Sequence, residues 1–251
     1  MPVSIILVSP LFSGNLGSVA RAMKNMGLKD LRLVAPKADP KDPDAQKMAA
    51  HAKEILKKAK RFPDLKKALK GFDLAVATSR RKGGQRGNWR DPRQFAVELA
   101  QLPKNRKVAL VFGREDTGLT NEQISLCQRI VTIPSHRSFA SLNLAQAVMV
   151  LAYEIFITKR TSMNRAKAVP SPLVGEGQGE GSHKPAKIQS LESMYEDLGK
   201  LLGEIGFLNQ QNPKHLMYLL RNLFNRARPT DKEVRIFRGI CRQVRWWGKK
   251  G

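Results

Sequence analysis

The chain has 251 residues, 41% of them hydrophobic, which suffices for one large domain or for a domain of about 150 residues with a small appendage. Lysine and arginine total 45 against 21 acidic residues, and the net charge of +24 favours a nucleic-acid partner over an anionic membrane surface. No apolar run approaches the ~18 residues of a spanning helix, and Cys127 and Cys241 lie far apart without metal-ligand spacing, so we expect a cytoplasmic protein without a membrane span, disulfide framework or metal site.

Strand and helix patterns alternate over the first 160 residues. A buried strand is predicted over 3–9, and a helix follows from about Asn15 to Gly27. Such alternation predicts an α/β domain with a mainly parallel sheet. The remaining predicted elements are strands over 31–36, 73–79, 107–113 and 129–134, a basic helical stretch over 44–70 broken near Pro63, and helices over 91–102, from Thr120 and over 141–157.

Residues 161–187 lose this periodicity and are rich in glycine, proline and serine, which predicts a flexible linker. We therefore expect a first domain over 1–160 and a small helical extension over 188–251. Thr230 and Glu233 form a capping box at the start of the last predicted helix. That helix has an apolar face of Val234, Phe237, Cys241 and Val244 and a basic face of Arg235, Arg238, Arg242 and Arg245.

The turn after the first strand carries glycines Gly14 and Gly17, so its spacing is G-x-x-G rather than G-x-G-x-x-G. A dinucleotide site needs the missing middle glycine and an acidic residue after the second strand, and here that strand ends in Ala35-Pro36. Asn15 suits an ordinary helix cap. Arg21 is harder to explain by structure alone, because it lies one turn in from the carboxyl edge of the predicted sheet, where α/β proteins bind ligands.

Two later stretches are also candidates for function. "VFGREDTGL" places Gly113, Arg114, Glu115 and Gly118 directly after a strand, and "SLNLAQAV" places Ser141 and Asn143 at the start of a long helix. Each has an ordinary alternative: a turn with a salt bridge in the first case, and a helix cap at Ser141 in the second. Their order along the chain is more specific than either pattern alone.

Taken together, these motifs resemble the SPOUT superfamily, and within it the bacterial tRNA 2′-O-methyltransferases of the TrmJ type. The resemblance runs through "GNLGSVARAMKNMGL", "ALVFGREDTGLTNEQ", "SLNLAQAV" and "AYEI", and it resumes after the predicted linker at "LFNRARPT". It implies a Rossmann-like α/β domain with a C-terminal deep trefoil knot, a homodimer, and a tRNA substrate bound across the subunits. Local sequence patterns do not predict a knot, because knots are nearly absent from protein folds.

The resemblance also implies that S-adenosyl-L-methionine is bound by the loop after "VFG", the "VTIP" segment and the "SLNL" turn. Arg21 would then lie at the acceptor ribose. A guanidinium rarely releases its proton, so we expect Arg21 to orient the nucleotide and stabilise alkoxide charge rather than act as a base. Asn15 and Glu115 would hold this geometry, and Ser141 would position the donor or the hydroxyl. The implied cofactor contacts are Thr78, Ser79, Gly113, Glu115, Ile133, Ser141, Leu142 and Asn143.

Two positions depart from the family pattern. Phe139 stands where relatives carry tyrosine, and "TSRRKGGQRGNW" replaces a T-S-A-R-x-R-like pattern, so a substrate arginine could be Arg80, Arg81 or Arg86. We also expect Arg235 and Arg238 to contact RNA.

The sequence thus predicts a tRNA 2′-O-methyltransferase acting on cytidine or uridine at nucleotide 32 of the anticodon loop. Two alternatives remain open: another tRNA or rRNA site, or a knotted RNA-binding protein that has lost catalysis.

Overall fold

The computed structural model describes the chain apart from residues 81–88, 137, 139–140, 169–184, 209–212 and 249–251. Within the described part, a seven-stranded sheet has the order β3-β2-β1-β6-β4-β7-β5, and every strand pair is parallel. The predicted α/β class with a parallel sheet is therefore confirmed. The strands are β1 Val3–Val8, β2 Asp30–Val34, β3 Lys60–Phe62, β4 Leu74–Thr78, β5 Trp89–Arg90, β6 Val108–Phe112 and β7 Arg129–Val131.

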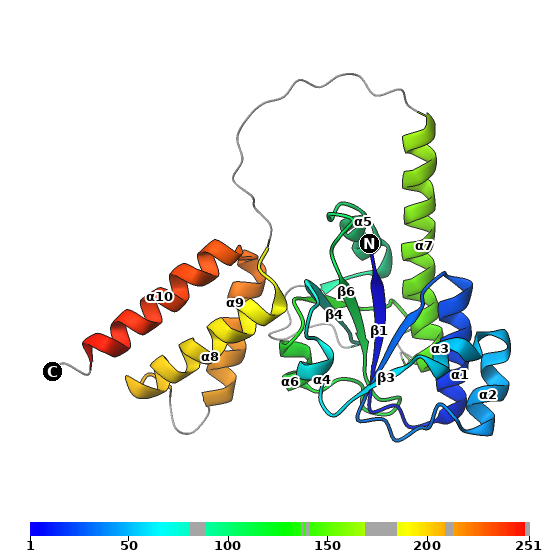
Figure 1. The fold of residues 1–251 in the computed structure, drawn as a ribbon, viewed down its shortest axis with the longest axis horizontal. Helices are drawn as coiled ribbons and strands as arrows, with labels where there is room; N and C mark the ends of the chain where they lie inside the picture. The colour runs from blue at the N-terminus through cyan, green and yellow to red at the C-terminus, as the bar shows by residue number, and fades with distance from the viewer. Residues whose placement is uncertain (81–88, 137, 139–140, 169–184, 209–212, 249–251) are drawn as a thin grey trace.

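Helices cover both faces of the sheet (Figure 1). Helices α1, α2, α3, α5 and α7 bury one face, whereas α4 and α6 bury the other. Among the described residues, no helix is both long enough and apolar enough to cross a membrane. The helices are α1 Ser13–Asn25, α2 Pro43–Ala49, the 3-10 turn η1 Ala50–Ala52, α3 Lys53–Lys57, α4 Leu65–Ala68, α5 Pro92–Ala100, α6 Asn121–Ser125, α7 Leu144–Ala168, α8 Ile188–Glu204, α9 Pro213–Ala227 and α10 Asp231–Trp247.

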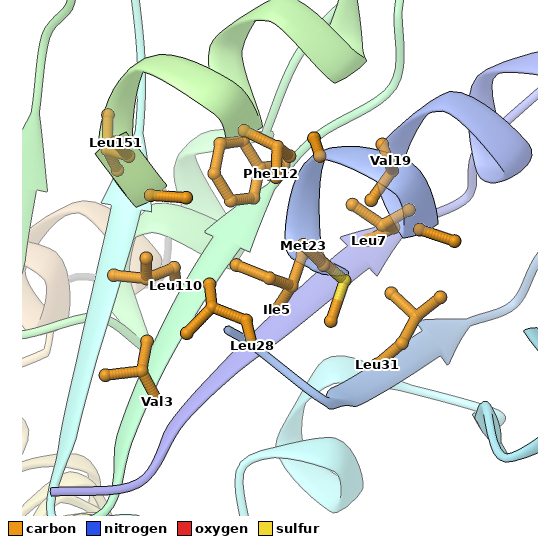
Figure 2. Close-up of a cluster of buried hydrophobic side chains, with 14 of the residues drawn as sticks. Val3, Ile5, Leu7, Val19, Met23, Leu28, Leu31, Leu110, Phe112 and Leu151 are labelled. Carbon is orange, nitrogen blue, oxygen red and sulfur yellow. The ribbon is translucent and has the colours of Figure 1, made fainter. Parts of the chain in front are cut away.

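Strand β1 is buried along its whole length because both faces of the sheet are covered. Ile5 and Leu7 point to the face covered by α1 and α7, and Figure 2 shows them packed against Val19 and Met23 of α1. The alternate residues Ile6 and Val8 belong to the cluster under α4 and α6. This arrangement explains why the strand is read as a continuous apolar run rather than as an alternating pattern.

Of the two glycines in the G-x-x-G turn after β1, Gly17 is the one that helix packing requires. A Cβ atom on Gly17 would lie 2.2 Å from the carbonyl oxygen of Ala45 and 2.8 Å from the amide nitrogen of Ala49. Helices α1 and α2 therefore touch backbone to backbone at Gly17, and any larger residue would force them apart. Gly14 has no such neighbour, since only the Met48 side chain comes within 3.8 Å.

Several predicted boundaries were wrong. The stretch 44–70 holds three short helices and the edge strand β3 instead of a basic helix with one break. A second short strand, β5, lies at the opposite edge of the sheet. The long helix begins at Leu144 instead of 141, and it ends at Ala168, inside the segment predicted as a linker.

The residues after the predicted linker form three helices, α8 to α10, which lie together beside α4 and α6 (Figure 1). The predicted capping box of Thr230 and Glu233 is present at the start of α10. The small core of this extension comprises Ala186, Leu191, Met194, Tyr195 and Val234.

Glu98 of α5 joins the helical extension to the sheet. Its carboxylate accepts hydrogen bonds from Arg129 of β7, at 3.0 Å, and from Arg228, which follows α9. Arg90 lies 3.7 Å away on the other oxygen. We call these four residues the Glu98 cluster. Other hydrogen bonds across the same boundary run from Arg106 to the Pro185 carbonyl, from Asn225 to the Cys127 carbonyl and from Lys66 to Glu196.

Asp30 gives the fold a measurable acid sensitivity. Burial alone would raise the pKa of this carboxyl group, but the Ser4 hydroxyl, at 2.6 Å, and the Arg32 guanidinium outweigh it and lower the pKa. A depressed folded-state pKa stabilises the protein above the unfolded value of about 4, and that contribution disappears as pH falls. We expect Asp30→Asn to cost about 0.5–1 kcal/mol at pH 7 and almost nothing near pH 2, as measured by urea unfolding at both pH values.

Candidate active site

A cleft opens at the carboxyl edge of β4, β6 and β7, which is where parallel sheets place their ligand sites. Four segments line it: residues 78–80 after β4, 112–119 after β6, 131 and 133 at the end of β7, and 141–147 at the start of α7. Of the residues predicted to contact a cofactor, all but Asn143 line this cleft. They are Thr78, Ser79, Gly113, Glu115, Ile133, Ser141 and Leu142.

The loop after β6 is folded back tightly on itself. A Cβ atom on Gly113 would lie 2.1 Å from the carbonyl carbon of Gly118, so only glycine fits at this position. Gly118 itself has a φ of +70°, in the left-handed region that favours glycine. The two glycines of "GREDTG" are therefore explained by the backbone of the loop.

Arg114 and Asp116 form the salt bridge that an ordinary turn would have. Nε and Nη2 of Arg114 donate to the two carboxylate oxygens of Asp116, at 3.0 and 2.7 Å, and this pairing lowers the Asp116 pKa to about 2. Because Arg114 is occupied by Asp116, the carboxylate of Glu115 is left for partners elsewhere in the fold.

Those partners lie in the turn after β1 and at the start of α7. Oε2 of Glu115 accepts from the backbone N–H of Leu11 at 3.0 Å, and Oε1 accepts from Nδ2 of Asn15 at 2.9 Å. Oδ1 of Asn15 accepts in turn from Nδ2 of Asn143 at 3.0 Å. Three segments far apart in the sequence are thus joined by one chain of hydrogen bonds, which we call the Asn15–Glu115–Asn143 network.

The helix-capping alternatives for Asn15 and Ser141 were wrong. Helix α1 begins at Ser13, so Asn15 lies inside its first turn, and its side chain bonds to Glu115 instead of to the helix backbone. At α7, the capping oxygen belongs to Asn143, whose Oδ1 accepts from the N–H of Ala145 at 2.8 Å. Ser141 precedes this cap, is exposed and lines the cleft.

Arg21 is not brought to the cleft of its own chain. It lies about two turns into α1 instead of one, it is exposed, and it is absent from the cleft lining. Within the described part of the chain, no hydrogen bond or ion pair engages its guanidinium. Arg80 does line the cleft, whereas Arg81, Arg86 and Phe139 lie outside the described residues.

The arginines of α10 are partly committed to the helical extension. Nε of Arg238 donates to Asp197 of α8 at 2.7 Å, and Arg245 makes a two-point contact with Glu204. Among the residues that the structure describes, Arg235 bonds only to the backbone carbonyl of Asp231, one turn earlier, and it remains exposed. Arg235 therefore has a cationic group to offer to a partner, while Arg238 would have to share it with Asp197.

The cleft has the composition of a small-molecule site. Phe112, Leu119, Val131 and Leu144 give it an apolar wall, and hydroxyl, amide and carboxylate groups surround that wall. Its charged lining residues balance: Arg80 and Arg114 are cations, and Glu115 and Asp116 are carboxylates. Such a cleft suits a ligand with a flat apolar ring and polar ends.

The chain is similar to known proteins over nearly its whole length. Residues 2–153 match the SpoU rRNA Methylase family, and residues 189–250 match the family described as tRNA methyltransferase TrmJ, C-terminal domain. A protein of Pectobacterium atrosepticum named tRNA (cytidine/uridine-2'-O-)-methyltransferase TrmJ is 40% identical over 242 residues, which is 96% of each chain. A relative of the same name from Salmonella choleraesuis is 38% identical over 247 residues and 96% of each chain.

Among solved structures, the crystal structure of TrmJ from Z. mobilis ZM4 superposes with a TM-score of 0.81 at 31% identity. The match covers 98% of this chain and 99% of that one, so it includes the helical extension as well as the sheet.

Proposed function

We propose that this chain, which belongs to the SpoU rRNA Methylase family and carries the C-terminal domain of the TrmJ tRNA methyltransferases, methylates a ribose 2′-hydroxyl of tRNA with S-adenosylmethionine as donor. The acceptor of this proposal is cytidine or uridine at nucleotide 32. The observation that carries the proposal is the Asn15–Glu115–Asn143 network, which joins the turn after β1 to the mouth of the cleft.

The residues of the cleft fit the proposed donor. Adenine needs an apolar slot, which Leu119, Val131 and Leu144 provide. The amino-acid and ribose ends need polar groups, and Thr78, Ser79 and Ser141 of the lining carry them. When bound, S-adenosylmethionine supplies a methyl group already activated by a positive sulfonium, so the reaction requires no metal.

The protein's own work is to align the acceptor hydroxyl and to manage its proton. In this proposal the network fixes the turn after β1, and Ser141 positions the hydroxyl or the donor. Arg21 binds the acceptor nucleotide and stabilises the negative charge that develops on its oxygen. Because Arg21 does not line the cleft of its own chain, the proposal places it at the cleft of a second subunit in a homodimer.

The other family properties belong to the same proposal. The C-terminal part of the α/β domain would form a deep trefoil knot, and the protein would act in the cytoplasm. The loop 113–119 and the start of α7 line one cleft although β7 lies between them in the sequence, an arrangement that a knot in this part of the chain requires. A crystal structure traced from Gly113 to Ala147 would show whether the chain passes through its own loop.

The test is methyl transfer from labelled S-adenosylmethionine to unmodified tRNA transcripts, with the modified nucleotide mapped. A 2′-O-methyl mark at nucleotide 32 is expected. A mark at a different nucleotide would keep the reaction and reject the position. Tight binding of tRNA and donor without any transfer would instead support the knotted RNA-binding protein that has lost catalysis.

Glu115→Gln is expected to lower kcat by about 10- to 100-fold, since the new amide must oppose the N–H of Leu11 or the Nδ2 of Asn15 with a donor. Single-turnover methyl transfer would measure this loss. Asp44→Asn removes an exposed carboxylate on α2 and serves as the matched control, with an expected change below about twofold. Equal rates in the two variants would show that the network does not set the geometry of the reaction.

A further inference from the structure

A second hollow lies at the carboxyl edge of the sheet, next to the cleft but on the other side of the loop after β6. It has a volume of about 690 Å³. Its floor is formed by the ends of β1 and β2, at Ser9 and Ala35, and its walls come from α6 and from residues 63–70, which include α4. Three lysines stand on this second wall: Lys66, Lys67 and Lys70.

The charge around this hollow is mostly positive. The segment 53–70 carries eight basic residues against two acidic ones, Glu54 and Asp64. Lys60 and Arg61 of the exposed edge strand β3 are paired with Asp30, at 3.7 Å, and with Asp39, at 2.7 Å, so they add little to this charge. Glu122 is the second carboxylate in the lining, beside Asp64. The hollow therefore has a net attraction for anions.

Two of the three lysines have cationic groups available. Lys66 is paired with Glu196 of α8, which raises its pKa and anchors it to the helical extension. Lys67 lies 3.7 Å from Asp64, and both side chains are about half exposed or more, so this pair is weak. Lys70 is exposed, and within the described residues no ion pair holds its ammonium group.

The hollow lies close to the Asn15–Glu115–Asn143 network. Ser9 lines the hollow, and Leu11, two residues later, donates its N–H to Glu115. Two residues of extended chain span at most about 7 Å. The hollow and the network therefore meet at the same edge of the sheet, where neighbouring strands lie only ~4.8 Å apart.

From this placement we infer that the hollow binds phosphate groups of the tRNA strand close to the ribose presented at the network. The inference rests on the proposed function and adds to it a backbone-binding site with Lys67 and Lys70 as its contacts. Such contacts fix the register of the strand without reading its bases. Flexible ammonium groups around an open hollow suit this role, because they follow a phosphate without demanding one geometry.

The experiment compares two double variants with the same spacing. Lys67→Ala with Lys70→Ala removes the two available cations. Lys104→Ala with Lys107→Ala removes two exposed lysines that precede β6, where the strands have their amino ends, away from the hollow at their carboxyl ends. For each protein, tRNA affinity is measured from 50 to 300 mM salt, roughly the range in which phosphate contacts are weakened. The kcat for methyl transfer and the affinity for S-adenosylmethionine are measured alongside.

The Lys67 and Lys70 variant is expected to weaken tRNA binding about tenfold and to reduce the slope of log K against log salt by about 1.4 to 2. Its kcat at saturating tRNA and its donor affinity should stay within about twofold of wild type, and the Lys104 and Lys107 variant should match wild type throughout. An equal loss of tRNA affinity in both double variants would show that only net charge matters and would overturn the inference. Unchanged tRNA affinity in both variants would overturn it as well.

Failure of the proposed function gives a different result. If the wild-type chain transfers no methyl group to any tRNA, the activity is wrong, but the salt slopes still test the hollow. A circular dichroism spectrum and a melting temperature close to wild type are expected for both variants, since all four lysines are exposed. The charge-reversed pair Lys67→Glu with Lys70→Glu should weaken binding further than the alanine pair, and a weaker effect would also contradict the inference.

Discussion

Arg21→Ala is expected to lower kcat for methyl transfer by about 10²–10³-fold while leaving the affinity for S-adenosylmethionine unchanged. In the proposed mechanism, Arg21 holds the acceptor nucleotide and offsets the charge that develops on the ribose oxygen. Arg21→Lys keeps the charge but loses the planar two-point contact, and it should recover only part of the rate. Single-turnover transfer at saturating tRNA measures the chemical step directly.

The position of Arg21 makes this prediction sharper. Because Arg21 lies outside the cleft lining of its own chain, a site completed across two subunits would contain Arg21 from one chain and Glu115 from the other. Random mixing of Arg21→Ala and Glu115→Gln subunits should then restore about a quarter of wild-type activity, since half of the dimers regain one intact site. Either variant alone provides the control. Activity no higher than the sum of the two inactive variants would place Arg21 and Glu115 of the same chain in the same site.

The sequence predicted which residues belong to the candidate site better than it predicted the hydrogen bonds between them. The sequence motifs pointed to Asn15, Glu115 and Asn143, and the structure brings these three together. Local patterns assigned Asn15 and Ser141 to capping because capping is a property of neighbouring residues. The partners of Asn15 lie 100 and 128 residues away in the chain, and no local pattern contains a contact of that range.

The strength of the local sequence pattern also determined which strands and helices could be predicted. Strands with long buried runs, such as β1 and β6, were predicted to within a residue or two because burial on both faces leaves a clear apolar signal. The edge strands β3 and β5 have only two or three residues and are largely exposed, so they carry no alternation. The end of α7 was missed because its last turns need no apolar stripe to remain helical.

The structure shows which of the basic residues behind the net charge of +24 are already held in ion pairs within the protein. Arginines on α10 that looked like one RNA-binding face are partly paired with Asp197 and Glu204 inside the extension. Lysines that were predicted to lie on a basic helical stretch line a hollow beside the proposed site. Charge is therefore informative about RNA contact only after the internal ion pairs have been subtracted.

Glu98→Ala is expected to lower the free energy of unfolding by about 2–4 kcal/mol, which is the largest effect on stability that we predict. Arg129 is only 5% exposed, and burial lowers the pKa of its guanidinium despite the neighbouring carboxylate. Without Glu98, this cation would keep one hydrogen bond to the Gln128 carbonyl and would face Arg90 and Arg228 without compensation. Urea unfolding followed by circular dichroism gives the change.

Two further variants separate the buried charge from the link between the sheet and the helical extension. Glu196→Ala breaks the exposed pair with Lys66, which joins the same two parts of the molecule, and it should cost less than about 1 kcal/mol. Adding Arg129→Met to Glu98→Ala removes the uncompensated cation and should recover much of the loss, because an apolar side chain tolerates burial where a lone charge does not. If the double variant were as unstable as Glu98→Ala alone, the loss would come from the released Arg228 and the extension it holds, not from Arg129.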